Sequence, residues 1–122
     1  MKKILFIEDE SALQKTFRDV LEKEGYQMVS ALDGENGLEL AKSQKPDLIL
    51  LDLILPKKNG FEVLEELKKD DSTREIPVIV LTNLEDIESV EKAIELGATT
   101  YLVKAQYTLE EVITKVKKAL EK

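Results

Sequence analysis

Short apolar runs alternate with longer amphipathic segments along the whole chain. The runs cover residues 4–7, 28–29, 48–51, 78–81 and 101–103. Each run has the length of a strand, and its unbroken apolar character is typical of a strand covered on both faces. Between the runs, apolar residues recur at helical spacing, so the pattern predicts five strands that are each followed by a helix. The clearest helical stripe consists of Leu109, Val112, Ile113, Val116 and Leu120.

The predicted helices have marked ends. Ser11 with Gln14 and Thr108 with Glu111 have the spacing of a capping box, in which a hydroxyl and a carboxylate or amide side chain cap a helix start reciprocally. Other ends are marked by single residues, with Asp33 and Asn59 as predicted N-caps and Gly25 and Gly97 just past predicted helix ends.

Strict alternation of strands and helices predicts an α/β fold with a parallel sheet between two helical layers. Right-handed crossovers leave few topologies for such a chain. We predict a (βα)5 flavodoxin-like three-layer sandwich with a five-stranded parallel sheet in the order 2-1-3-4-5, in preference to half of a Rossmann fold. Residues 1–122 are expected to form one domain. A ligand site is expected beyond the carboxyl ends of the strands.

Composition narrows the chemistry. The chain has neither cysteine nor histidine, so carboxylates, hydroxyls and lysines must do any chemical work, and these groups suit a hard cation such as Mg²⁺. The net charge of −7, from 25 acidic and 18 basic residues, argues against direct nucleic-acid binding. The apolar run near the N-terminus is too short for a signal peptide, and no run is long enough to cross a membrane. A cytoplasmic protein is expected.

Polar residues follow four of the predicted strands. Glu8 and Asp9 follow the first, Asp52 the third, Thr82 the fourth and Lys104 the fifth. In the predicted topology these residues would converge in one pocket that contains three acids, one ammonium and one hydroxyl. Gathered carboxylates repel one another, so a divalent cation is expected among them. Each residue alone has an ordinary interpretation as a helix cap, loop residue or surface lysine, but their joint occurrence at these strand ends favours a site.

This set resembles the receiver domains of two-component response regulators, and the resemblance covers the whole chain. The family pattern is an acidic pair after the first strand, an Asp-x-x-x-Pro-x-x-x-Gly motif after the third, Thr or Ser after the fourth and Lys after the fifth. Every element is present and in order. The matching residues are Glu8, Asp9, Asp52, Pro56, Gly60, Thr82 and Lys104.

The resemblance implies that Asp52 accepts a phosphoryl group from a sensor histidine kinase or a phosphotransfer protein. It further implies that Asp9 binds Mg²⁺ directly, Glu8 binds it through water, and the backbone carbonyl of Ile54 is another ligand, with Mn²⁺ able to substitute. Lys104 would contact a phosphoryl oxygen. Such a protein is a phosphoacceptor that assists its own phosphorylation and dephosphorylation, and is not otherwise an enzyme.

The resemblance also implies a switch. Thr82 would move its hydroxyl onto the phosphoryl group, and Tyr101 would change rotamer with it. The face built by the last two helices and the last strand, residues 86–120, would then bind a downstream protein. A monomeric stand-alone receiver is expected, with phosphorylation-dependent dimerisation through this face left open.

The chain departs from the family pattern at several positions. Ala105 stands where the family usually has proline, and Asn83 stands where it usually has a very small residue. Ile54 and Leu84, two residues beyond Asp52 and Thr82, are both apolar. We hypothesise that this apolar pair shields an acyl phosphate from water and lengthens its lifetime.

Three alternatives differ in function. A haloacid-dehalogenase-type enzyme would need a second Asp where Ile54 stands, and a flavin-binding protein would need a phosphate loop where the acidic pair would repel phosphate. A receiver-fold scaffold without a working switch, whether an engineered or consensus sequence or a pseudo-receiver interaction module, agrees with the regular capping. It does not explain the clustered acids and Lys104.

Overall fold

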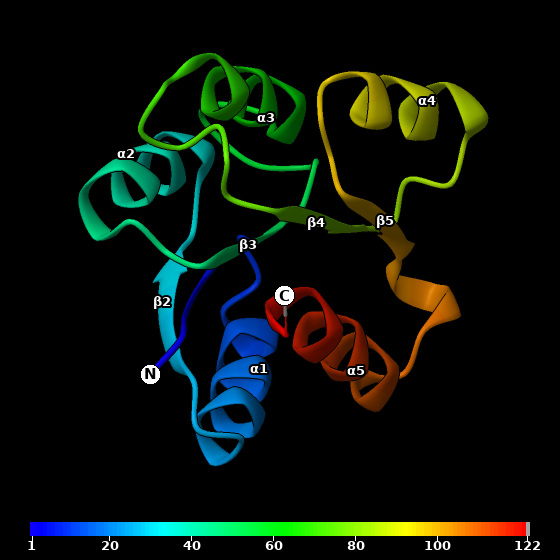
Figure 1. The fold of residues 1–122 in the computed structure, drawn as a ribbon. Helices are drawn as coiled ribbons and strands as arrows, with labels where there is room; N and C mark the ends of the chain where they lie inside the picture. The colour runs from blue at the N-terminus through cyan, green and yellow to red at the C-terminus, as the bar shows by residue number, and fades with distance from the viewer. Residues whose placement is uncertain (122) are drawn as a thin grey trace.

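The computed structural model describes residues 1–121, and its centre is a sheet of five parallel strands. They lie in the order β2-β1-β3-β4-β5, which confirms the predicted topology (Figure 1). The apolar runs lie within these strands, so the strand predictions are also confirmed. The strands are β1 (Lys3–Ile7), β2 (Gln27–Ala31), β3 (Leu48–Leu51), β4 (Val78–Thr82) and β5 (Thr100–Val103).

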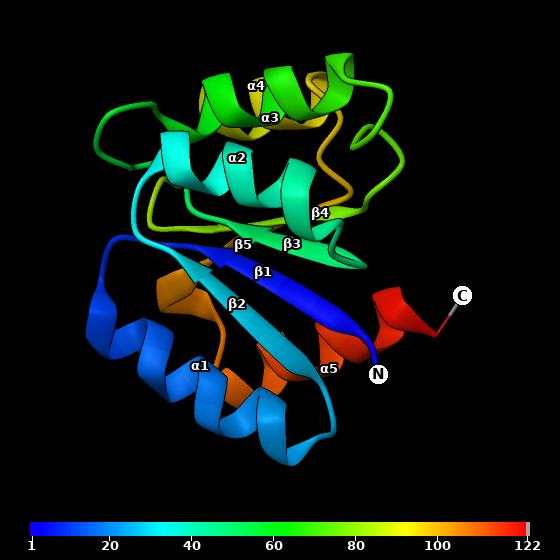
Figure 2. The same ribbon diagram turned by 90° about the vertical axis from the view of Figure 1, so that its left-hand side faces the viewer.

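Helices cover both faces of the sheet. Figures 1 and 2 show α1 and α5 on one face and α2, α3 and α4 on the other, which is the predicted three-layer sandwich. A short 3₁₀ helix, η1 (Lys104–Gln106), leads from β5 towards α5. The helices are α1 (Ser11–Lys23), α2 (Gly34–Gln44), α3 (Gly60–Lys69), α4 (Ile87–Glu95) and α5 (Leu109–Leu120). Within residues 1–121, no helix combines the length and apolar character needed to cross a bilayer.

The core consists of two apolar clusters, one on each side of the sheet. Successive residues of β1 divide between them, because side chains alternate along a strand. Leu5 and Ile7 pack with residues of α2 and α3, whereas Ile4 and Phe6 pack with residues of α1 and α5. Both faces of the central strands are therefore buried, which explains their unbroken apolar runs.

Most predicted helix ends are confirmed. The Asp33 carboxylate accepts the Asn36 N–H at the start of α2, and reciprocal capping boxes open α3 at Asn59 and α5 at Thr108. Gly25 and Gly97 have φ angles of 92° and 108°, the left-handed conformation expected after a helix.

The predicted capping box at Ser11 is wrong. The N-cap of α1 is Glu10, which makes no side-chain capping hydrogen bond. Gln14 is buried and directs its amide at backbone carbonyls at the end of the sheet instead of at a helix-terminal N–H. A buried backbone carbonyl without a hydrogen-bond donor is costly, and Gln14 supplies a donor at this strand end instead of a local cap.

One glycine allows the close backbone contact that shapes the loop after β3. A Cβ at Gly60 would lie 2.4 Å from the Asp52 carbonyl oxygen and 2.4 Å from the Leu53 Cα. The Gly60 N–H also donates to the Leu53 carbonyl at 2.9 Å. A side chain at this position would push α3 away from the end of β3, where Asp52 lies.

Candidate functional site

The predicted acids and Lys104 meet at the carboxyl ends of β1, β3 and β5. Carboxylate oxygens of Glu8, Asp9 and Asp52 all lie within 4.8 Å of one another. Glu8 and Asp52 are the residues that follow β1 and β3, and Lys104 follows β5. The parallel register brings these strand ends together, so the structure forms the cluster that the topology predicts.

Lys104 bridges the two buried acids. Its Nζ lies 2.6 Å from Glu8 Oε1 and 3.0 Å from Asp52 Oδ2. Glu8 is 1% exposed and Asp52 4% exposed, whereas Asp9 is exposed at the rim. Both contacts are charge-assisted hydrogen bonds in a region of low solvent access.

The second oxygen of each buried acid accepts a backbone N–H two residues further on. Glu8 Oε2 accepts from Glu10 at 3.0 Å, and Asp52 Oδ1 accepts from Ile54 at 3.1 Å. Sequence reasoning missed both donors, and from the Ile54 backbone it assigned a role only to the carbonyl. An Asp at the start of a turn commonly accepts an N–H two residues later, so the sequence held a signal for the Asp52 bond, whereas this rule does not cover Glu8. These bonds fix the carboxylate planes.

Burial and charge shift two pKa values at the site. Burial raises the pKa of Glu8 to about 7, although the hydrogen bonds from Lys104 and from the Glu10 backbone oppose the shift. Burial would lower the pKa of Lys104, but the hydrogen bonds and charges of Glu8 and Asp52 outweigh it and raise that pKa. Lys104 is therefore a cation at neutral pH, while the raised pKa of Glu8 lies close to neutral pH.

The donor set fits a divalent cation that prefers oxygen ligands. Three carboxylates against one ammonium leave two negative charges when all the groups are ionised. Oxygen-only ligands with this charge match Mg²⁺ or Mn²⁺. Glu8, Asp9 and Asp52 are the residues that would hold the ion.

The two predicted switch residues both contact the backbone of Leu84. Thr82 is fully buried at the end of β4, and its Oγ1 lies 3.5 Å from the Leu84 N–H, a long hydrogen bond. The hydroxyl of the half-buried Tyr101 donates to the Leu84 carbonyl at 2.8 Å. A shift of the loop between β4 and α4 would therefore change the hydrogen bonds of both side chains.

Three of the residues that depart from the family pattern differ in exposure. Ile54 is 54% exposed, Leu84 is half-buried and Asn83 is exposed. Ala105 lies in η1, and residues 1–121 contain no cis peptide bond, as expected without a proline at this position.

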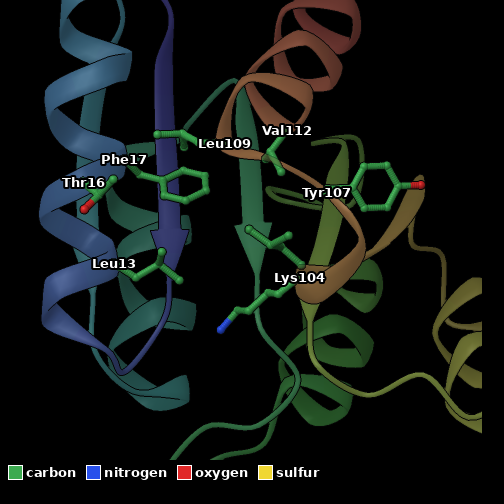
Figure 3. Close-up of a pocket in the computed structure, with 8 residues that line it drawn as sticks. Leu13, Thr16, Phe17, Lys104, Tyr107, Leu109 and Val112 are labelled. Carbon is green, nitrogen blue, oxygen red and sulfur yellow. The ribbon is translucent and has the colours of Figure 1, made fainter.

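An apolar cavity of about 150 Å³ lies on the other side of the Lys104 side chain. Figure 3 shows the alkyl chain of Lys104 along one wall, with its nitrogen directed away from Tyr107. The cavity holds none of the three acids, so it supports the lysine stem and is not the site itself. Its lining residues are Leu13, Thr16, Phe17, Leu81, Lys104, Tyr107, Leu109 and Val112.

Comparison with known proteins identifies the family of this chain. The family described as response regulator receiver domain matches residues 4–117. The chain is 39% identical to the DNA-binding dual master transcriptional regulator RpaA of Synechocystis over 122 residues, all of this chain and 50% of that protein. It is 38% identical to the polar-differentiation response regulator DivK of Brucella anthropi over 103 residues, 84% of each chain.

A solved structure confirms the fold. The receiver domain protein of Methanospirillum hungatei, described as CheY-like, superimposes with a TM-score of 0.92 at 27% identity over 99% of this chain and 94% of that one. The chain spans about half the length of the transcriptional regulators that it matches. The family match over residues 4–117 and the shared fold show that this chain belongs to the receiver domains of two-component response regulators.

Proposed function

We propose that the carboxylate of Asp52 accepts a phosphoryl group in a reaction that requires Mg²⁺. The observation that carries this proposal is the position of Asp52. It is almost fully buried, it contacts the Lys104 ammonium at 3.0 Å, and it shares a cluster within 4.8 Å with Glu8 and Asp9. A carboxylate held beside an ammonium and a cation-binding pair is equipped for nucleophilic attack on phosphorus.

The transfer proceeds by in-line displacement. An Asp52 oxygen attacks the phosphorus of a phosphohistidine, the new O–P bond forms as the N–P bond breaks, and the electron pair of that bond returns to the imidazole nitrogen. The Lys104 ammonium then contacts a phosphoryl oxygen, which carries the negative charge after transfer. The Ile54 N–H keeps the other Asp52 oxygen oriented. When bound, Mg²⁺ supplies positive charge for the phosphoryl oxygens.

The phosphoryl donor in this proposal is a sensor histidine kinase or a phosphotransfer protein, and the output is a change in protein binding. Thr82 and Tyr101 would carry the change through the Leu84 backbone to the face of α4, β5 and α5. The net charge of −7 disfavours direct contact with nucleic acid. We propose that residues 1–122 work as one monomeric, cytoplasmic signalling unit whose only catalysis acts on its own phosphorylation.

Labelling with acetyl phosphate tests this function. We expect wild-type protein with Mg²⁺ to gain the mass of one phosphoryl group, and Asp52→Asn or chelator to prevent the gain. An equal gain in Asp52→Asn would move the acceptor elsewhere. No gain in wild-type protein, with no beryllofluoride binding, would favour the inert scaffold.

A further inference from the structure

Gln14, in the first turn of α1, is a buried polar residue that the proposed chemistry does not use. It is only 5% exposed, although glutamine is usually found at the surface. Because it does not cap α1, its burial requires another reason.

The side-chain amide of Gln14 gathers three backbone carbonyls. Its Nε2 lies 2.8 Å from the Phe6 oxygen, 3.1 Å from the Glu8 oxygen and 3.0 Å from the Ala31 oxygen. A reversed amide would place its own oxygen against three carbonyl oxygens, so these contacts fix the orientation. Within residues 1–121, Gln14 Oε1 has no hydrogen-bond partner. The donor end of the side chain therefore determines its placement.

The amide lies where the pairing of β1 with β2 stops. The Glu8 N–H still donates to the Ala31 carbonyl at 2.9 Å, but β2 ends at Ala31 and Asp33 is already the N-cap of α2. The backbone N–H groups beyond Ala31 therefore no longer continue the pairing with β1. Gln14 replaces them as the donor to the Glu8 carbonyl.

That carbonyl belongs to the peptide group that joins Glu8 to Asp9. Fixing the plane of this peptide fixes the directions in which the two acidic side chains leave the backbone. We propose that Gln14 is a positioning residue that aims Glu8 and Asp9 at Asp52, and so organises the cation-binding cluster. This inference rests on the proposed function for the identity of the cation, Mg²⁺.

Gln14→Met tests the inference, because methionine has a similar length and lacks the donor. Loss of a group that orients metal ligands typically weakens metal affinity tenfold or more, so we expect Mg²⁺ affinity to fall by about tenfold. Thr73→Val is the matched control. Thr73 is 1% exposed and donates to the Leu67 carbonyl at 2.7 Å beyond the end of α3. Its loss also removes a buried hydrogen bond to a carbonyl, but away from the acids.

Two readouts on folded protein separate positioning from general destabilisation. Calorimetric titration gives the Mg²⁺ affinity, and hydrogen exchange without metal follows the Glu10 N–H, which is bonded to the Glu8 carboxylate. Gln14→Met should weaken Mg²⁺ binding and speed this exchange, while Thr73→Val changes neither. Equal behaviour of the two variants would overturn the inference. If wild-type protein fails to bind Mg²⁺, the proposed function fails, and the exchange rate alone still decides whether Gln14 orders the turn.

A second variant keeps the test open if Gln14→Met does not fold. Gln14→Lys retains N–H donors, and Lys68 shows that a lysine can serve two carbonyls, those of Arg74 and Ile76, at 3.1 and 2.9 Å. We expect Gln14→Lys to keep the slow exchange of the Glu10 N–H. Fast exchange in a folded Gln14→Lys protein would contradict the role of the donor.

Discussion

At the scale of single residues, the candidate site depends on one ammonium shared by two buried carboxylates. Lys104 is the cation that contacts both Glu8 and Asp52, and its own side chain is only 18% exposed. Removing one member of a buried ion pair costs more than the pair contributes, because it leaves charge without compensation. Lys104 is therefore expected to contribute to stability in addition to its role in the proposed chemistry.

We predict that Lys104→Met lowers the free energy of unfolding by roughly 3 kcal/mol at pH 8 without metal. The cause is the two uncompensated carboxylates, so added Mg²⁺ should restore part of the loss. Urea denaturation with and without Mg²⁺ measures both effects. Lys117→Met is the control, because Lys117 pairs with Glu24 at the surface, where solvent screening weakens an ion pair, so its loss should cost much less. Equal losses in the two variants would show that the Lys104 contacts are weak.

Ile54 lies next to the phosphoacceptor candidate and leaves an apolar surface there. A polar side chain at this position could orient a water molecule towards an acyl phosphate. We predict that Ile54→Asn speeds phosphate release on the order of tenfold, whereas Ile54→Val leaves it unchanged. Timing release from purified phosphoprotein checks this, and an unchanged lifetime in Ile54→Asn would refute the shielding hypothesis.

At the scale of elements, the starts of α1 and α5 differ although both carry a capping-box sequence. In α5, Thr108 Oγ1 accepts the Glu111 N–H at 3.1 Å, and the Glu111 carboxylate accepts the Thr108 N–H at 2.8 Å. In α1, the residue at the matching place, Gln14, is turned into the sheet edge. Of these two helix starts, only that of α5 therefore gains stability from a capping box.

This difference predicts unequal costs for two hydroxyl deletions. Thr108→Ala should lower the free energy of unfolding by about 1 kcal/mol, as loss of an N-cap does. Ser11→Ala should stay within about 0.5 kcal/mol of wild type, as expected for a surface position. Urea denaturation of both variants decides, and an equal cost would mean that Ser11 does cap α1 in solution.

Periodicity predicted the elements well because burial on both faces leaves a direct mark on the sequence. Right-handed crossovers left few strand orders, the flavodoxin-like order chosen among them is the observed one, and the cluster of Glu8, Asp9, Asp52 and Lys104 followed from that order. The role of Gln14 could not be predicted, because the direction of its side chain depends on where β2 stops. The end of β2 is determined by its pairing with β1, which is distant in sequence, so the spacing of residues around Gln14 does not reveal it.

At the scale of the whole molecule, folding brings together the acids Glu8, Asp9 and Asp52, which lie apart in the unfolded chain. Burial raises the pKa of Glu8 from 4.5 to about 7. The folded protein therefore holds a proton on Glu8 between these values, whereas the unfolded chain has released it. The contribution of this group to stability is complete below pH 4.5 and is lost as the pH rises through 7.

We accordingly predict that, in chelator, Glu8 lowers the free energy of unfolding as the pH rises from 4.5 to 7, by an amount on the order of 3 kcal/mol. Glu8→Gln should lack this component. Saturating Mg²⁺ should diminish it in wild-type protein, because a bound cation displaces the proton. Urea denaturation across this pH range provides the measurement. Identical pH profiles for wild-type protein and Glu8→Gln would contradict the raised pKa.

The hydrogen bond between Lys104 and Glu8 also constrains the order of events during synthesis. It joins side chains 96 residues apart, so a chain still emerging from the ribosome cannot make it until β5 has been translated. Until then the two buried acids lack their ammonium, so the cluster of Glu8, Asp52 and Lys104 forms only after translation has passed β5. Any chemistry that needs all three side chains therefore cannot begin on a nascent chain before that point.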